Sequence, residues 1–281
     1  MDIQCPGRMI NISKKFILGT LAFLTALVFI AVYQKTSQKP EVVFLDVGQG
    51  DSILVILPGD IQILIDGGPS DKISAKLSKY FPFYDKDIEL AILTHPHTDH
   101  LNGLVSVFKD YNVKNFIWSG ANYESKLYSN FVEVLKKEGS VIYLAKAGDV
   151  VSYGNQPILK ILSPPEILLG KSFKDVHDSD VVSEIDLGGK KLLLMGDSNE
   201  VVESRLTASN AVTDIDVLKV GHHGSKTATS PQLLQIARPE EAVISVGNNS
   251  YGHPAANVLS NLSNIGAKIF RTDKIGDVIY K

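Results

Sequence analysis

All seven histidines of this 281-residue chain lie between residues 95 and 253, each in a loop-like position just after an apolar segment or beside Gly, Pro or Asp. Histidines that serve only as surface or core residues would be scattered along the chain. Loops positioned by a scaffold often carry binding and catalytic groups, and imidazole is both a common metal ligand and a proton carrier near neutral pH. The distribution therefore predicts a metal or catalytic site at strand ends, built from His95, His97, His100, His177, His222, His223 and His253.

The densest part of this pattern places three imidazoles and one carboxylate within six residues, in the order His95-x-His97-x-Asp99-His100. The segment follows an apolar stretch at 89–93 and precedes an expected helix. Alternate residues of an extended loop point the same way, so His95 and His97 can meet one metal while Asp99 and His100 face a second. Two metals about 3.5–4 Å apart would form a template for hydrolysis. A solvated polar loop is the alternative interpretation.

The composition limits what such a site can use. A single cysteine, Cys5, cannot form an internal disulfide or a cysteine-based zinc or iron–sulfur site, so any metal must use histidine and carboxylate ligands. With 44% apolar and 21% charged residues the chain is ordinary globular protein. Residues 1–40 hold five basic side chains and one acidic one, which leaves a net charge of −7 on the remaining 241 residues. Any contact with nucleic acid must therefore be local.

The N-terminal part contains an apolar run. Residues 16–33 have no charged side chain, and a helix of that length spans roughly 27 Å. We expect an uncleaved transmembrane anchor between a short segment, 1–15, and a polar linker, 34–40; a cleaved signal peptide and a buried core helix are the alternatives. Three basic side chains precede the run and two follow it. This bias predicts a single-pass protein of the cell membrane whose main domain, 41–281, is extracytoplasmic.

The pattern of the main domain indicates two sheets. Short apolar runs at 42–45, 52–57 and 61–65 predict three antiparallel strands, and the Pro-Gly-Asp turn at 58–60 predicts the hairpin between the second and third. Strands then alternate with helical stretches to the C-terminus. Two sheets with outer helices accommodate this order, so the predicted fold class is α/β, a four-layer αββα sandwich.

Four further motifs join the histidine motif: Phe-Leu-Asp-Val-Gly-Gln-Gly-Asp-Ser at 44–52, Met-Gly-Asp at 195–197, Val-Gly-His-His-Gly-Ser at 220–225 and Tyr-Gly-His-Pro at 251–254. Together they resemble the hydrolase domain of ComEC-type DNA-uptake proteins, in the metallo-β-lactamase superfamily. The resemblance covers essentially residues 41–281 and implies the αββα sandwich of that superfamily. A many-span channel accompanies this domain in the transporters, whereas this sequence offers one apolar segment. We therefore expect a stand-alone, membrane-tethered relative.

The resemblance implies two zinc ions, with manganese as the alternative metal. It puts His95 and His97 on the first metal, Asp99 and His100 on the second, and Asp197 between both as a bridging carboxylate. Asp197 also follows an apolar run and a glycine, which offers its carboxylate at a strand tip. The alternative role for Asp197 is that of an N-cap for the next helix.

The sequence leaves the roles of several other residues open. The third ligand of the first metal is His177 or, as a substitute, Asp178, and we favour His177. His253 either completes the second metal site or contacts the substrate; a plain turn histidine is the alternative. The resemblance also places a tight loop beside the metals that orients a metal-bound histidine. The residues expected in this supporting role are Asp46, Gln49 and Asp51.

The histidine pair at 222–223 follows an expected strand, so one side chain should point to the site and its neighbour away. We expect His223 to face inward and to supply a proton to the leaving group, with Lys219 and Lys226 nearby to attract a phosphoryl oxygen. A structural turn is the alternative. The expected substrate-binding residues of this loop are His222, Ser225 and Lys226.

These residues predict a metal-dependent hydrolase in which Asp99 positions an activated water. A Gly-x-Ser-x-Gly elbow is missing from the sequence, so covalent catalysis has no candidate. The resemblance favours a phosphodiesterase or nuclease related to DNA uptake, with DNA or another phosphodiester held locally at the metals. The alternatives are a hydrolase of a small ester, lactone or lactam, and an inactive binding or assembly protein on the same fold.

Overall fold

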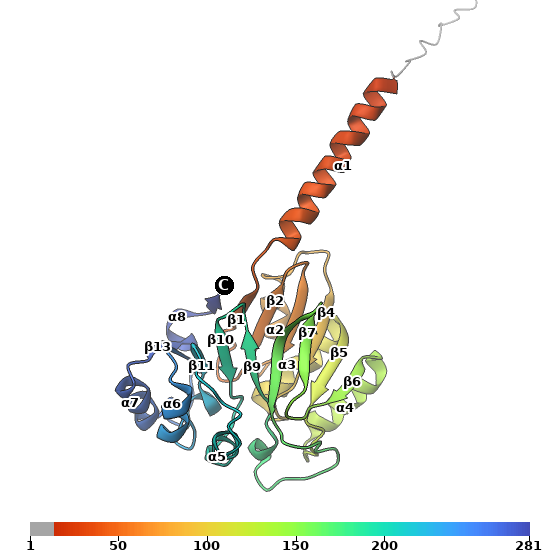
Figure 1. Cartoon of the computed structure of the whole chain (residues 1–281). Helices are drawn as coiled ribbons and strands as arrows, with labels where there is room; N and C mark the ends of the chain where they lie inside the picture. Colours follow the sequence, from red (N-terminus) through yellow and green to blue (C-terminus); the bar gives the residue numbers. More distant parts are fainter. Residues whose placement is uncertain (1–13) are drawn as a thin grey trace, which may run out of the picture.

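The computed structural model describes residues 14–281, so most of the predicted segment 1–15 lies outside the described residues. The first element, helix α1 (Lys14–Thr36), stands away from the rest of the molecule (Figure 1). None of the helices within residues 14–281 combines the length and the apolar content that crossing a membrane requires. The transmembrane anchor predicted over 16–33 is therefore not supported, and the extracytoplasmic location stays a prediction.

The first of two seven-stranded sheets begins directly after the linker. Its order is β14-β1-β2-β3-β4-β5-β6. The strands on the β14 side pair antiparallel, and those from β3 to β6 pair parallel. The hairpin predicted at 58–60 joins β2 to β3, with Ile53 opposite Ile65. The bounds are β1 (Glu41–Phe44), β2 (Ile53–Leu57), β3 (Ile61–Ile65), β4 (Asp87–Ile92), β5 (Asn112–Trp118), β6 (Val141–Leu144) and β14 (Val278–Tyr280).

The second sheet has the order β13-β12-β11-β10-β9-β8-β7. Strands β10 to β13 are parallel, and β7 to β10 are antiparallel. Strand β7 was not predicted; it is a largely exposed edge strand, so its sequence lacks a buried apolar face. The bounds are β7 (Val150–Tyr153), β8 (Gln156–Ser163), β9 (Val182–Asp186), β10 (Lys191–Leu194), β11 (Val217–Lys219), β12 (Glu241–Ile244) and β13 (Lys268–Arg271).

Three apolar clusters hold four layers together, which confirms the predicted α/β sandwich (Figure 1). One cluster fills the space between the sheets, and each of the others joins a sheet to its outer helices. Helices α2 (Lys72–Leu77), α3 (Thr98–Asp110) and α4 (Lys126–Glu138) cover the first sheet. Helices α5 (Glu200–Ala208), α6 (Pro231–Ala237) and α7 (Ala256–Asn264) cover the second. The short helices are η1 (Val176–Ser179), η2 (Gly221–Gly224) and α8 (Thr272–Ile275).

A close backbone approach fixes the loop after β3 against helix α3. A Cβ atom added to Gly103 would lie 1.8 Å from the carbonyl oxygen of Gly67, so a larger side chain cannot be accommodated here without moving the backbone. The Gly67 amide also donates to the carbonyl of His100 at 2.8 Å. The end of β3 is thereby held beside the histidine motif that begins α3.

Candidate metal centre

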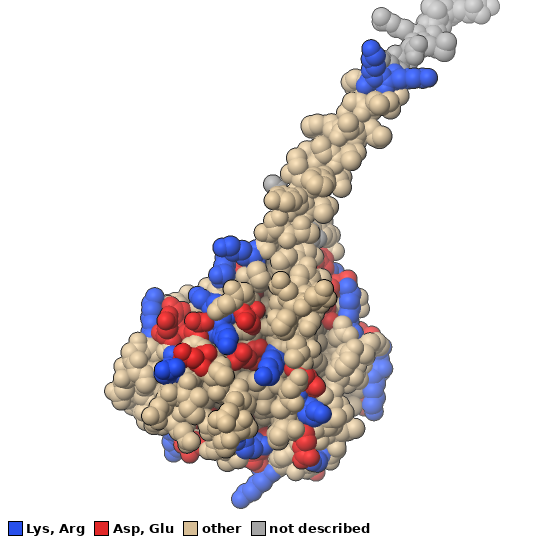
Figure 2. All heavy atoms as spheres, viewed as in Figure 1, with Lys and Arg blue, Asp and Glu red and all other residues tan. Residues whose placement is uncertain are grey.

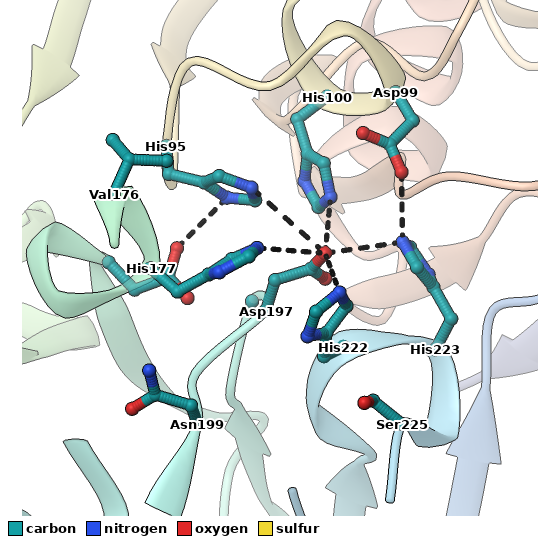
Figure 3. Close-up of polar contacts among 12 residues, drawn as sticks. His95, Asp99, His100, Val176, His177, Asp197, Asn199, His222, His223 and Ser225 are labelled. Atoms are coloured by element: carbon teal, nitrogen blue, oxygen red, sulfur yellow. Dashed lines mark hydrogen bonds and ion pairs between the residues drawn. The ribbon is translucent and has the colours of Figure 1, made fainter. Parts of the chain in front are cut away.

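Most of the predicted ligands converge where strands from both sheets end (Figure 3). Strand β4 leads into the motif at 95–100, and strand β10 leads to Asp197. Helix η1 presents His177, and helix η2, which follows β11, presents His222 and His223. Strands β10 and β11 are parallel neighbours, so the segment that carries Asp197 and helix η2, which follow these strands, lie side by side. The sandwich thus gathers residues that are up to 128 positions apart in the sequence.

The first group of side chains consists of His95, His97 and His177, which we call the imidazole cluster. Their ligand nitrogens all lie within 4.8 Å of one another. Burial lowers the pKa of His95 to about 3 and the pKa of His97 to about 4. Both rings are therefore neutral at pH 7, which is the state that a metal ligand needs.

The second group consists of Asp99, His100, Asp197 and His223, which we call the carboxylate cluster. Its ligand atoms also lie within 4.8 Å of one another. Burial opposes a charge on His100, but the carboxylates of Asp197 and Asp66 outweigh it and raise its pKa well above the usual value. Asp197 likewise holds the pKa of His223 well above the usual value against the effect of burial. The carboxylates therefore favour positive charge at this place.

Asp197 lies between the two clusters. Its Oδ2 atom is surrounded by five imidazole nitrogens (Figure 3). Burial would raise the pKa of Asp197, but the neighbouring His223 and His100 lower it well below its usual range. The N-cap of α5 is Asn199, so the capping role is not the one that Asp197 plays. The distances from Oδ2 to Nε2 are 4.0 Å for His95, 3.3 Å for His100, 4.0 Å for His177, 3.8 Å for His222 and 3.3 Å for His223.

Three of these histidines are oriented in the same way: Nδ1 is hydrogen-bonded to an outer oxygen atom and Nε2 faces Asp197. A carbonyl or ionised carboxylate can only accept, so such a partner keeps the proton on Nδ1 and the lone pair on Nε2. Metal-ligating histidines are commonly oriented by partners of this kind. The outer oxygens are Asp66 Oδ2 at 2.7 Å for His100, Asp175 Oδ1 at 2.6 Å for His177 and the Ser245 carbonyl at 2.8 Å for His223. Asp180 Oδ1 lies 2.9 Å from His95 Nδ1 but makes no hydrogen bond.

The residues present fit a metal. The Nε2 atoms of His95, His100 and His177 are buried and make no hydrogen bond, and neither does Asp197 Oδ1. Burying polar atoms without partners is unfavourable unless something else satisfies them. Clustered imidazole nitrogens and carboxylate oxygens are ligand types that divalent transition metals take. The described residues thus form a candidate centre for two divalent metal ions.

The histidine pair on η2 differs from the expectation for an extended segment. His222 has φ 47° and ψ 48°, and His223 has φ 53° and ψ 23°, so both residues are in the left-handed region. Alternation applies only to extended backbone. Both rings therefore face Asp197, and His222 forms a further group of potential ligands with His177 and Asp197. His223 is buried among the candidate ligands, whereas the side chain of His222 is 25% exposed.

Two other predicted ligand positions lie apart from the clusters. His253 is in none of the ligand groups that the described residues form; its ring lies 5.5 Å from that of His222 and 5.7 Å from that of Tyr251. Burial lowers the pKa of His253. Asp178 accepts a hydrogen bond from Asn199 at 3.3 Å and is also outside these groups. The structure therefore brings His177, and not Asp178, to the imidazole cluster.

The predicted substrate loop has one exposed cation. Lys226 is exposed, whereas Ser225 is buried and its hydroxyl lies 3.1 Å from that of Thr227. Lys219 is fully buried, pairs with Asp51 and donates to the Gly196 carbonyl at 2.8 Å. Of these two lysines, only Lys226 can therefore contact a substrate.

The predicted supporting residues have separate positions. Asp51 Oδ1 lies 3.4 Å from His223 Nδ1, so it can help to orient this histidine. Gln49 accepts a hydrogen bond from the Gly247 amide at 3.2 Å. A Cβ on Gly247 would lie 2.4 Å from the Gln49 backbone nitrogen, so this contact requires glycine. Asp46 accepts from the Gly48 amide at 3.2 Å and shapes the loop rather than contacting a ligand histidine.

Sequence reasoning missed three carboxylates beside the ligands: Asp66, Asp175 and Asp180. Asp66 also accepts from the hydroxyl of Thr94 at 2.7 Å. Burial and the nearby Asp197 raise the pKa of Asp180 well above its usual value. Asp66 directly follows the strand predicted at 61–65, and Asp197 likewise follows an apolar run. This position at a strand end could have marked Asp66 in the sequence.

A two-sheet α/β sandwich with clustered histidine and carboxylate ligands at its strand ends defines a metallo-hydrolase fold. The chain belongs to the metallo-beta-lactamase superfamily, whose family model matches residues 45–248.

Curated relatives confirm the resemblance to ComEC-type proteins. The chain is 28% identical to ComE operon protein 3 of Bacillus subtilis (strain 168) over 289 residues, covering 96% of this chain and 36% of the relative. It is 31% identical to Recombination protein 2 of Haemophilus influenzae over 263 residues, covering 90% of this chain and 30% of the relative. The chain thus spans about a third of the length of these proteins.

Solved structures share the fold at low identity. CmlA, a diiron β-hydroxylase from Streptomyces venezuelae, superposes with a TM-score of 0.56 at 13% identity, covering 88% of this chain and 55% of CmlA. YhfI from Bacillus subtilis, described as a metallo-beta-lactamase fold protein, superposes with a TM-score of 0.54 at 12% identity, covering 86% and 100%. At these identities the likeness concerns the fold alone.

Proposed function

We propose that this chain is a binuclear metal-dependent phosphodiesterase that cleaves nucleic acid, and that DNA is its substrate. One observation carries the proposal: two clusters of ligand atoms share the buried carboxylate of Asp197. In the proposed centre His95, His97 and His177 hold one metal, and Asp99, His100 and His223 hold the other. Imidazole and carboxylate ligands suit zinc, and manganese is the alternative.

Hydrolysis is the reaction that this ligand set supports. When bound, two neighbouring divalent metals polarise a phosphoryl oxygen and activate water near neutral pH. Asp99 is the member of the carboxylate cluster with the most exposed side chain, at 31%. We therefore assign it to orienting the attacking water. The exposed Lys226, on the adjoining loop, is assigned to contact a phosphate of the substrate.

The choice of nucleic acid rests on the relatives and on charge. Proteins named for recombination and competence are among the relatives. Basic and acidic side chains are mixed on the face of the domain seen in Figure 2, which therefore lacks a continuous basic surface. Two divalent cations would supply positive charge where the phosphodiester must bind, so a basic groove is not required.

The test is metal analysis of the full chain, followed by assays on single- and double-stranded DNA, RNA and bis(p-nitrophenyl) phosphate. We expect about two metals per chain and cleavage that is lost on chelation and restored by Zn²⁺ or Mn²⁺. A fully loaded chain that leaves every phosphodiester intact would refute the proposal. Hydrolysis of a lactone or lactam by that same preparation would move the substrate to the alternative class.

A further inference from the structure

An exposed tyrosine lies beside the metal centre. Tyr251 is 74% exposed, although large aromatic side chains are usually buried on folding. We propose that Tyr251 is a stacking platform for a nucleobase, so that the substrate is a single strand with accessible bases. This inference rests on the proposed phosphodiesterase function and deepens it.

The loop that carries Tyr251 is held in place by one side chain. Asn249 Nδ2 donates to the carbonyls of Gly247 and His253, each at 2.9 Å. Asn249 Oδ1 accepts from the backbone amides of Tyr251 at 3.1 Å and His253 at 3.0 Å. The amide group thus ties both ends of the loop together. The backbone beneath Tyr251 is therefore fixed before a ligand arrives, which lowers the entropy that binding costs.

A continuous row of rings connects Tyr251 to the metal centre. The ring of Tyr251 lies 5.7 Å from that of His253, with an interplanar angle of 35°, and His253 lies 5.5 Å from His222. His222 Nε2 is in turn 3.8 Å from Asp197 Oδ2. A strand whose phosphate binds at the metal centre can therefore place one of its bases against Tyr251.

The chemistry of the position favours a base over a phosphate or a sugar. A tyrosine ring offers a flat apolar face, and every nucleobase can stack on such a face whatever the sequence. Bases in a duplex are already stacked on each other, so a single strand is the form that an exposed ring can bind. Lys226, the exposed lysine that follows η2, remains for the phosphate backbone of the strand.

The experiment compares two decamers with the same deoxyribose-phosphate backbone, one of thymidines and one without bases. With the metal-loaded full chain, Tyr251→Ala should raise KM for the thymidine decamer about 5- to 150-fold, which is the range for losing one stacked base. The kcat should change little, and KM for the abasic decamer should stay as in the wild type. Tyr251→Phe should behave like the wild type. Phe83→Ala is the matched control, because Phe83 is 94% exposed and precedes β4, away from the strand ends that carry the ligands.

Binding of phosphorothioate-linked versions of both decamers, followed by fluorescence anisotropy, separates the two hypotheses. If the chain cleaves DNA but Tyr251→Ala affects both decamers equally, base stacking is refuted and the phosphodiesterase stands. If binding depends on bases and on Tyr251 but no phosphodiester is cleaved, the proposed function fails and the stacking site stands. A chain that binds neither decamer refutes both.

Discussion

The imidazole cluster contains three histidines and no carboxylate of its own, whereas the carboxylate cluster combines two histidines with Asp99 and Asp197. The pKa values separate them accordingly. Burial dominates in the first cluster and keeps His95 and His97 neutral. In the second, neighbouring carboxylates overcome burial and favour charge on His100 and His223. The carboxylate cluster therefore attracts a cation by charge, and the imidazole cluster attracts it by nitrogen lone pairs.

The two clusters also differ in how they are supported. Asp66, which orients His100 in the carboxylate cluster, is 1% exposed. Asp175, which orients His177 in the imidazole cluster, has a side chain that is 49% exposed. His177 itself comes from the short helix η1 rather than from a strand end. The comparison indicates a buried support for His100 and a half-exposed support for His177, at two sites that share Asp197.

The largest effect should come from the residue that the two clusters share. Asp197→Ala should lower the metal content at both positions and abolish turnover, because its carboxylate faces ligands of both clusters. Metal per chain, measured by mass spectrometry of the purified protein, checks this. Asp214→Ala is the control, since Asp214 is exposed and pairs with Arg238 far from the ligands. Loss of a single metal would show that Asp197 belongs to one cluster only.

The next effect concerns the carboxylate cluster alone. His223→Ala should reduce the metal content from about two per chain to about one, because His223 Nε2 lies 3.2 Å from Asp99 and 3.3 Å from Asp197. His253→Ala is the matched control and should keep both metals, since His253 is outside the ligand groups of the described residues.

The opposite result has a clear meaning. Full metal content with reduced turnover in His223→Ala would return His223 to the proton donor expected from the sequence, a role typically worth roughly 10²- to 10⁴-fold in rate. The two roles exclude each other at Nε2, because a nitrogen that binds a metal cannot carry a proton.

The sequence predicted those parts of the fold and site that depend on local order along the chain. The first three strands and their hairpin follow from apolar runs and a turn, and the spacing of His95 and His97 brings them together within one loop. The strand tip at Asp197 is the same kind of local signal.

The remaining features depend on relations that a sequence does not display. Asp66 hydrogen-bonds to His100, and Asp180 comes within 2.9 Å of His95, only because the sandwich places separate loops side by side. The alternation expected for His222 and His223 failed because both adopt left-handed backbone angles. Strand β7 lacks the buried face that would have marked it.

A smaller effect should show which residue, His177 or Asp178, is the third ligand of the first metal. His177→Ala should weaken binding of the first metal and leave the second in place, since His177 lies with His95 and His97 and is not a member of the carboxylate cluster. Titration of the stripped protein with Zn²⁺, followed by calorimetry, should show one weakened site. Asp178→Ala should leave both sites intact. The reverse pattern would make Asp178 the ligand and move His177 to a purely structural position.

The smallest effects concern the outer carboxylates and test the difference in support directly. In Asp66→Asn an amide nitrogen can replace Oδ2 and face two donors, the Thr94 hydroxyl and His100 Nδ1. The His100 proton must then move to Nε2, which removes the lone pair that the metal needs. We expect about a 100-fold loss of metal affinity at the second site, the upper end for such partners.

Asp175→Asn should lower metal affinity by at most about 10-fold at the first site, because water can reach the half-exposed Asp175 and replace it. Competition with a chromophoric chelator measures both affinities, and thermal unfolding of the stripped variants controls for misfolding. Equal losses at the two sites would mean that burial of the outer carboxylate does not set the strength of the metal site, and the distinction between a buried and a half-exposed support would then be wrong.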